Sequence, residues 1–154
     1  MQEYIGTKLI KAEPMTRGEY AKLSGRNSIM TEKGESETDE GYHVRYEDGY
    51  ESWSPKLVFE RAYQKYSSMN FGNALELLKQ GFKVARIGWN GKGMFLYYVP
   101  AAAYPPSTEI AKKAFGGEDV PYGAYLAMKT AQGNVVPWLA SQTDMLSDDW
   151  CVVE

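Results

Sequence analysis

The stretch FKVARIGWNGKGMFLYYV, residues 82–99, consists of two apolar runs on either side of a turn that contains two glycines. Residues 82–89 and 94–99 have the composition of strands, and the intervening NGKG at 90–93 is typical of a tight turn. Strands joined by so short a turn pair in antiparallel fashion. This stretch therefore predicts a hairpin, and with it an antiparallel sheet.

A helix is predicted immediately before this hairpin. Asn70 is a suitable N-cap, and Gly81 can end the helix. Between these two residues, apolar side chains recur at the helical spacing i, i+3, i+4, i+7, namely at Phe71, Ala74, Leu75 and Leu78. One face of the helix is thus expected to pack against the sheet.

Further elements follow the hairpin. Residues 100–117 form a long connection, with one helical turn predicted at 109–115. The rest of the chain predicts a second hairpin at 125–130 and 135–138, a one- or two-turn helix begun by a Ser141–Asp144 capping box, and a last strand at 150–153.

The first part of the chain has strand and helix signals of its own. In order, they predict a strand at 4–12 ended by Pro14, a capped helix from Thr16 to Leu23, a mobile polar loop at 28–40, a hairpin of 42–46 and 50–53, and a helix at 56–66 with Ser54 as N-cap. We therefore predict an α+β protein in two parts. A small α+β domain at residues 1–66 precedes a domain at 69–154 that has a small antiparallel sheet and a leading helix.

Composition and charge exclude several classes of protein. Of the 154 residues, 44% are hydrophobic and 24% charged, which is typical of a globular chain. The net charge of −3 lacks the basic surplus that binding to a nucleic-acid polymer requires. The apolar stretch at 94–104 is too short to cross a bilayer, and the opening MQEY has no signal-peptide character. We expect a soluble cytoplasmic protein without membrane contact.

Cysteine and histidine are too scarce for most metal or thiol chemistry. The chain has one cysteine, Cys151, inside the apolar run 150–153, where it is interpreted as a small hydrophobic residue. His43 is the one histidine, and no second histidine or cysteine lies near it in the sequence. A zinc site and a Cys–His dyad are therefore not expected, and we predict neither a metal nor a cofactor.

The hairpin turn carries the first group of candidate binding residues. Trp89 either covers the edge of the core or provides a face on which a base can stack. Asn90 favours turn conformations in any case. Lys92 lies between two glycines, whose exposed N–H groups can approach a phosphate closely. Arg86, inside the predicted strand, is expected to pair with a carboxylate.

The second group follows the second hairpin. Trp138 is either a core residue or a second stacking surface, and Phe71 at the start of the leading helix presents the same choice. Ser141 and Asp144 are explained by helix capping, yet a helix start can also face an anion. Asp148 and Asp149 could accept hydrogen bonds from a ribose or an adenine, and the sequence does not distinguish them.

Three stretches together carry a resemblance to a known family: MNFGNAL at 69–75, VARIGWNGKGMFL at 84–96 and WLASQTDMLSDDW at 138–150. Their order and spacing resemble the phage Thoeris anti-defence family of the second type, whose members act as sponges. The resemblance implies a compact α+β domain assembled as a dimer of dimers. It also implies that the domain binds cyclic ADP-ribose isomers, and in some members cyclic dinucleotides, inside the infected bacterium. Residues 1–66 resemble small phage domains of unassigned function.

The resulting hypothesis is a protein that sequesters a cyclic nucleotide immune signal without cleaving it, at a site between subunits of a homotetramer. The ligand-binding residues would be Phe71, Trp89, Asn90, Lys92, Trp138, Ser141, Asp144 and Asp148. Two alternatives stay open. A nucleotide-hydrolysing enzyme would need a general base, for which no carboxylate pair stands out. A phage structural or accessory protein would need polymer contacts, for which no basic stripe is present.

Overall fold

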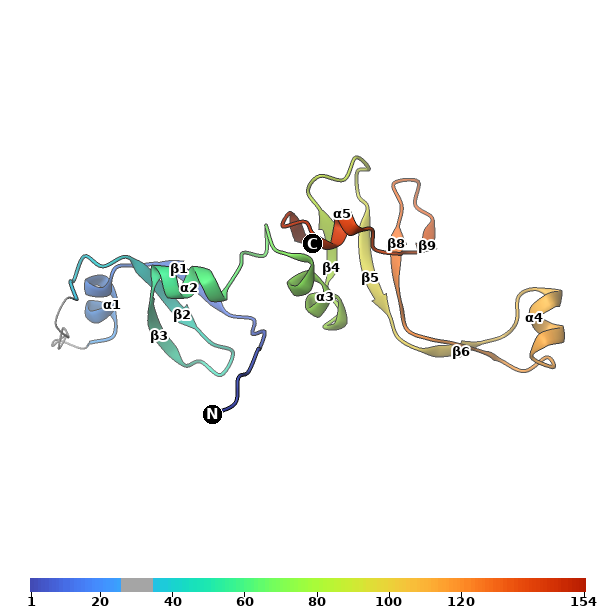
Figure 1. Cartoon of the computed structure of the whole chain (residues 1–154), viewed down its shortest axis with the longest axis horizontal. Helices are drawn as coiled ribbons and strands as arrows, with labels where there is room; N and C mark the ends of the chain where they lie inside the picture. Colours follow the sequence, from blue (N-terminus) through green and yellow to red (C-terminus); the bar gives the residue numbers. More distant parts are fainter. Residues whose placement is uncertain (26–34) are drawn as a thin grey trace. The chain divides into compact units, whose positions relative to one another are not determined.

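The structure is a computed structural model that describes residues 1–25 and 35–154. The chain divides into two compact units, Met1–Gln64 and Lys65–Glu154 (Figure 1). Both helices and antiparallel strands are present, so the predicted α+β class is confirmed. Residues 28–34 of the predicted polar loop lie outside the described residues. Within the described part of the chain, no helix has the length and apolar character needed to cross a bilayer.

The first unit is built on a three-stranded antiparallel sheet in the order β1-β2-β3. Its elements are β1 (Lys11–Pro14), α1 (Arg17–Leu23), β2 (Gly41–Arg45), β3 (Glu51–Pro55) and α2 (Lys56–Ala62). Val44 and His43 of the central strand are buried. The His43 ring lies between Glu13 of β1 and Glu51 of β3, at 3.2 and 3.3 Å, and so links all three strands.

Two local signals in the first unit are confirmed, the capping box of α1 and the hairpin turn. Thr16 and Glu19 form the predicted capping box at the start of α1. The predicted hairpin is also present, and Gly49 in its turn has a φ of 83°, which glycine tolerates and other residues rarely adopt.

Three other predictions for this unit are wrong. Residues 4–10 are not part of a strand, because β2 offers partners only to residues 11–14. Ser54 is not an N-cap: it pairs with Tyr42 in the sheet, and Pro55 occupies the cap position without a side-chain hydrogen bond. The helix that follows ends at Ala62, since Tyr63 is already extended.

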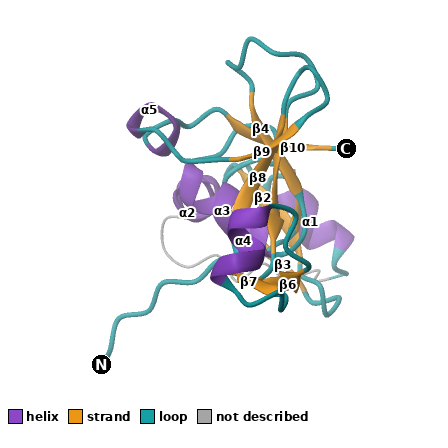
Figure 2. Ribbon diagram, turned by 90° about the vertical axis from the view of Figure 1, so that its right-hand side faces the viewer, coloured by secondary structure: helices purple, strands orange, loops and turns teal. Residues whose placement is uncertain are grey.

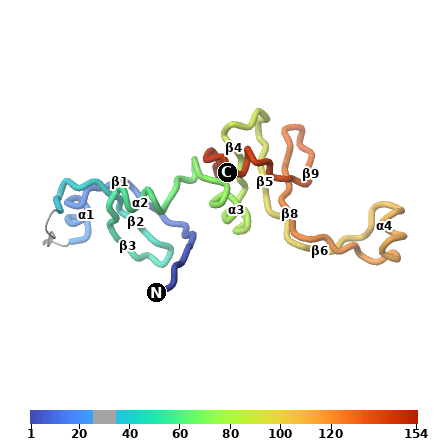
Figure 3. Tube along the Cα trace, in the orientation of Figure 1, coloured from blue at the N-terminus to red at the C-terminus, as the bar shows by residue number. Residues whose placement is uncertain are grey.

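The second unit contains a five-stranded antiparallel sheet in the order β10-β4-β5-β8-β9, on which α3 packs (Figures 1 and 3). Its elements are α3 (Phe71–Lys79), β4 (Lys83–Arg86), β5 (Phe95–Val99), β6 (Ala102–Tyr104), α4 (Glu109–Ala114), β7 (Val120–Tyr122), β8 (Tyr125–Lys129), β9 (Val135–Pro137), α5 (Gln142–Met145) and β10 (Trp150–Val153). The core consists of Met69, Ala74, Leu78, Val84, Leu96 and Trp150.

The leading helix forms as the sequence predicts. The Asn70 side chain accepts a hydrogen bond from the Asn73 N–H at 2.9 Å and thereby caps α3. Ala74 and Leu78 of the apolar stripe are fully buried against the sheet. Gly81 follows the helix with a φ of 93°, which lets the chain turn back into β4.

The strand predicted at 82–89 is shorter than expected, because β4 ends at Arg86. Residues 87 and 88 turn away from the sheet, and both of their N–H groups bond to Asp149, one to its carbonyl and one to its carboxylate. Trp89 therefore lies beyond the strand rather than at its end. The contact of residues 87 and 88 with Asp149 joins residues that are far apart in the sequence, so the local apolar pattern could not predict it.

The connection between β5 and β8 contains two strands that the sequence pattern did not predict. β6 pairs with β7 in antiparallel fashion, and the predicted helix α4 lies between them, capped by Thr108. We refer to β6, α4 and β7, residues 102–122, as the arm. The arm extends away from the sheet in Figure 1, and Figure 2 views it with α4 in front.

We expect residues 65–154 to fold alone, because this unit has its own core and sheet. The fragment should begin at Lys65 rather than Met69, because two residues before Met69 bond to the segment around β10. The Tyr66 carbonyl accepts from the Val152 N–H, and the Ser68 hydroxyl donates to the Asp148 carbonyl. A cooperative thermal transition of the fragment, at a temperature close to that of the same unit in the whole chain, would support this. A fragment that shows no cooperative transition would contradict it.

Candidate functional site

Three aromatic rings from separate segments of the second unit pack around the ring of Trp150. Trp150 is fully buried, and the rings of Phe71, Trp89 and Trp138 lie 5.4, 5.5 and 6.0 Å from it, measured between centroids. Trp89 and Trp138 also contact each other edge to face at 6.5 Å. We call these four residues the aromatic cluster. Three of its members are predicted binding residues.

The cluster belongs partly to the core. Trp150 is one of the core residues, whereas Phe71, Trp89 and Trp138 are half-buried and pack against that core. The two interpretations of the tryptophans, as core or as stacking surface, are therefore not exclusive. Each of the outer rings contributes to packing and leaves part of its residue's surface exposed to solvent.

A charged network lies next to the aromatic cluster. The Arg86 guanidinium donates from Nε to Asp149 at 2.7 Å and from Nη1 to Asp144 at 3.1 Å, which confirms the predicted carboxylate pairing. Asp144 also accepts from the Ser141 hydroxyl at 2.7 Å in the predicted capping box. The Trp150 indole N–H donates to the Asp144 carbonyl at 2.9 Å. The network therefore joins the start of α5 to strands β4 and β10 of the sheet.

The pKa values of both carboxylates are lower than usual. Burial alone would raise the pKa of Asp144, but hydrogen bonds from Ser141, Arg86 and Trp89 outweigh burial. The hydrogen bond from Arg86 is the main cause of the lowered pKa of Asp149. Burial alone would raise this pKa, and the hydrogen bond from the Gly88 N–H lowers it further. Both groups are consequently held as carboxylates.

The glycine turn carries the predicted cation. Asn90 and Lys92 are exposed, and within the described residues no hydrogen bond or ion pair joins either side chain to the aromatic cluster. Gly93 has a φ of 70°. Lys129 of β8, which no sequence pattern singles out, donates from Nζ to the Gly93 carbonyl at 3.2 Å. Two lysines thus lie at this turn. Lys129 could not be predicted, because it comes from a different strand that is distant in the sequence.

The acidic candidates separate into two kinds. Asp144 and Asp149 are engaged by Arg86, whereas the Asp148 side chain is exposed. The Asp148 backbone carbonyl accepts a hydrogen bond from the Ser68 hydroxyl at 2.9 Å, which holds this segment in place. Of the three, Asp148 is the one whose carboxylate is not committed to Arg86.

The one thiol of the chain belongs to β10 of the second unit. Cys151 is half-buried in β10, and burial is the main cause of its raised pKa, which disfavours the reactive thiolate. No group of three or more histidine, cysteine, aspartate or glutamate side chains among the described residues could hold a metal ion.

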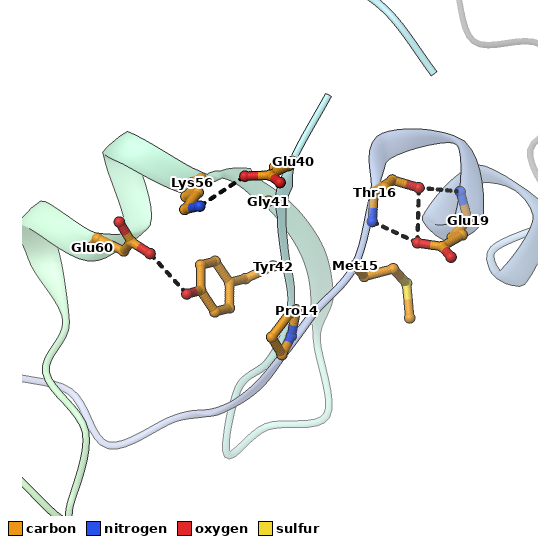
Figure 4. A pocket seen from close by; sticks show the side chains of 9 residues that line it. All are labelled: Pro14, Met15, Thr16, Glu19, Glu40, Gly41, Tyr42, Lys56 and Glu60. Atoms are coloured by element: carbon orange, nitrogen blue, oxygen red, sulfur yellow. Dashed lines mark hydrogen bonds and ion pairs between the residues drawn. The ribbon is translucent and has the colours of Figure 1, made fainter. Parts of the chain in front are cut away.

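A pocket of about 400 Å³ lies in the first unit, and no predicted binding residue lines it (Figure 4). Its carboxylates already have partners, because Glu40 pairs with Lys56 at 2.7 Å and Glu60 accepts from the Tyr42 hydroxyl at 2.9 Å. The hydrogen bond from Lys56 lowers the pKa of Glu40. The lining residues are Pro14, Met15, Thr16, Glu19, Glu40, Gly41, Tyr42, Lys56 and Glu60.

Comparison with known sequences identifies the second unit. The sequence model of the Tad2-like family, described as the Thoeris anti-defense 2-like domain, matches residues 69–153. This match covers more than half of the chain, so the chain belongs to the Tad2-like family. A relative named Thoeris anti-defense 2, from Bacillus phage SP01, is 41% identical over 87 residues, which are 56% of this chain and 97% of the relative. The resemblance inferred from the three stretches is confirmed, and the chain is a phage anti-defence protein.

Proposed function

We propose that the second unit binds a cyclic nucleotide immune signal of the infected bacterium and sequesters it without cleaving it. The signal would be a cyclic ADP-ribose isomer or a cyclic dinucleotide, captured in the host cytoplasm. The observation that carries this proposal is the aromatic cluster, whose Trp89 directly precedes a turn that contains Lys92 and accepts a hydrogen bond from Lys129, in a domain of the Thoeris anti-defence family.

The chemistry of the site suits such a ligand. A purine has a flat π-face, and the exposed parts of Trp89 and Trp138 offer complementary faces. Lys92 and Lys129 would supply positive charge for phosphates, and the glycines of the turn would admit a close approach. Asp148 would accept hydrogen bonds from a ribose hydroxyl or an adenine amine. Stacking and charge together would give affinity without any reactive group.

Binding without turnover is supported by the state of the acidic residues. A general acid must hold a proton near neutral pH, yet the pKa values of Asp144 and Asp149 are lowered and both are bonded to Arg86. Both carboxylates also hold the fold together, so neither is free to serve as a base. We therefore assign them a positioning role beneath the aromatic cluster.

We further propose that the protein acts as a homotetramer, a dimer of dimers, with each ligand held between subunits. A single unit leaves the exposed parts of Trp89 and Trp138, and the Asp148 side chain, open to solvent, whereas a second subunit would enclose the ligand and exclude water. Enclosure would slow dissociation, which a stoichiometric sponge needs more than it needs fast association.

Native mass spectrometry with a panel of cyclic nucleotides tests this proposal directly. We expect an intact ligand to bind and to be recovered unchanged after denaturation. Recovery of a hydrolysed product would instead identify an enzyme. Absence of binding across the panel, with a folded protein, would overturn sequestration and favour an accessory role in the phage.

We expect Trp89→Ala to weaken nucleotide binding by roughly five- to 150-fold, because one base stacked on an aromatic ring contributes ~1–3 kcal/mol. The melting temperature should also fall, since Trp89 packs on Trp150.

Lys92→Ala separates the effect on binding from the effect on stability. The Lys92 side chain is exposed, so the affinity for nucleotide should fall while the melting temperature stays unchanged. Lys79→Ala, an exposed lysine on α3, is the matched control. Equal affinities of all three variants and the parent would refute this site.

A further inference from the structure

The turn at residues 90–93 is packed tightly at Gly91. A Cβ atom added to Gly91 would overlap the Met94 sulfur, and it would lie 2.9 Å from the Met94 Cγ and 3.1 Å from the Ala131 Cβ. Carbon atoms in van der Waals contact lie about 3.5–4.0 Å apart. The place of a side chain at position 91 is thus filled by Met94, and the turn rests on Ala131, which lies between β8 and β9.

Gly91 is needed for space and not for backbone conformation. Its φ lies outside the left-handed region, whereas Gly93 has a φ of 70°. At Gly93 the nearest atom to an added Cβ would be the Lys129 Nζ, at 3.9 Å, which is an ordinary contact distance. The two glycines on either side of Lys92 therefore have different roles: Gly93 bends the chain, and Gly91 makes room for Met94.

The β8–β9 hairpin holds the turn at a second point. Lys129 donates from Nζ to the Gly93 carbonyl at 3.2 Å, and the same Nζ lies 5.8 Å from the centre of the Phe95 ring. Among the residues that the structure describes, the N–H groups of Gly91, Lys92 and Gly93 donate to no backbone carbonyl. The turn is therefore held by contacts at both glycines, while its own donors stay available to an anion.

We propose that Gly91, Met94 and Ala131 are positioning residues, which hold Lys92 and the N–H groups of the turn ready for a phosphate of the nucleotide. This inference rests on the proposed sequestration and names the residues that order its phosphate-binding turn. The three residues act through the turn and do not touch the nucleotide themselves. Methionine suits this role, because its unbranched side chain fills irregular gaps. A turn that is already ordered loses less conformational entropy when the nucleotide binds.

Gly91→Ala tests the contact with Met94. The added methyl group must displace Met94 or the turn, so we expect the affinity for nucleotide to fall about tenfold, or ~1.4 kcal/mol. Isothermal titration would use isomers of cyclic ADP-ribose and cyclic dinucleotides as probes. Gly123→Ala is the matched control, because an added Cβ meets no atom within 4 Å there and the φ of Gly123 is not left-handed. The affinity of Gly123→Ala should equal that of the parent protein.

Truncation of Met94 shows whether the effect of Gly91→Ala is one of space. The double variant Gly91→Ala/Met94→Ala should bind about threefold more tightly than Gly91→Ala alone, because the shorter side chain leaves room for the added methyl group. Gly93→Ala should also weaken binding, but through backbone strain, so Met94→Ala should not restore it. Ala131→Gly removes one methyl group from an exposed residue and should lower the affinity roughly threefold, which keeps the contact testable if a thermal melt shows Gly91→Ala to be unfolded.

A second comparison separates positioning from a general loss of structure. If Gly91 acts through Lys92, then Gly91→Ala/Lys92→Ala should bind no more weakly than Lys92→Ala alone, and Gly91→Ala should make the affinity less dependent on salt. Losses that multiply in this double variant, or a Gly91→Ala protein that binds as tightly as the parent, would overturn this inference and leave sequestration standing. A parent protein that binds none of the probes would overturn sequestration itself, and this inference with it.

Discussion

Arg86→Met should lower the free energy of unfolding of the second unit by about 3 kcal/mol, because the substitution leaves two carboxylates without their cation. Arg86 and Asp144 are largely buried, with 16% and 14% of their side chains exposed, and Asp149 is about one-third exposed at 33%. The partial exposure of Asp149 keeps the expected loss at the lower end of the range for buried pairs. Urea denaturation of the fragment 65–154 and of the whole chain would measure it.

The cost of this substitution should depend on pH in a defined direction. The pKa values of Asp144 and Asp149 are lowered in the folded state, so their contribution to stability is present above the unfolded value of about 3.9 and is lost as the pH falls through the folded values. Without Arg86, both carboxylates would gain from protonation instead. The stability difference between parent and variant should therefore narrow below about pH 4. A difference that stays constant from pH 7 to 3 would show that Arg86 acts by packing alone.

Trp150→Ala should cost ~3–5 kcal/mol, the usual loss for a tryptophan deleted from a core. Trp150 has no exposed surface, three rings pack on it, and its indole N–H donates to the Asp144 carbonyl. A single domain is commonly stable by only ~5–15 kcal/mol, so most of the stability of this unit could be lost. Thermal melts of the variant would be compared with those of Trp138→Ala.

Trp138→Ala is the matched control because Trp138 lies in the same cluster but is half-buried. The melting temperature of Trp138→Ala should fall clearly less than that of Trp150→Ala. Trp150→Phe should be intermediate, since a ring remains while the hydrogen bond to Asp144 is lost. If Trp138→Ala proved as destabilising as Trp150→Ala, the division of the cluster into a buried floor and a partly open rim would be wrong.

Features with local causes could be predicted from the sequence. The caps at Thr16, Asn70 and Ser141 all form, because a cap needs only residues within one helical turn. The hairpins around Gly49 and Gly133 form for a similar reason, since a short turn brings adjacent strands together. The α+β class follows from these elements.

Features with distant causes could not be predicted. β6 and β7 are short and separated by a helix, so neither shows a strand pattern until its partner is known. β4 ends early because Asp149, far along the chain, binds the turn after Arg86. The same distance explains why Asp148 and Asp149 could not be told apart from sequence. The aromatic residues could be selected individually, but their gathering around Trp150 depends on the complete sheet.

The pairing of β10 has a consequence for biosynthesis. Met69 and Trp150 exchange two backbone hydrogen bonds, at 2.8 and 3.1 Å, and β10 pairs along its length with β4. Met69, which precedes α3, is thus held in place by β10, the last strand of the unit. While the ribosome is still translating residues 150–153, the nascent chain exposes the apolar side of α3 and an unpaired edge of β4. This unit must therefore stay soluble during translation without its central tryptophan, and can fold only when its last strand has left the exit tunnel.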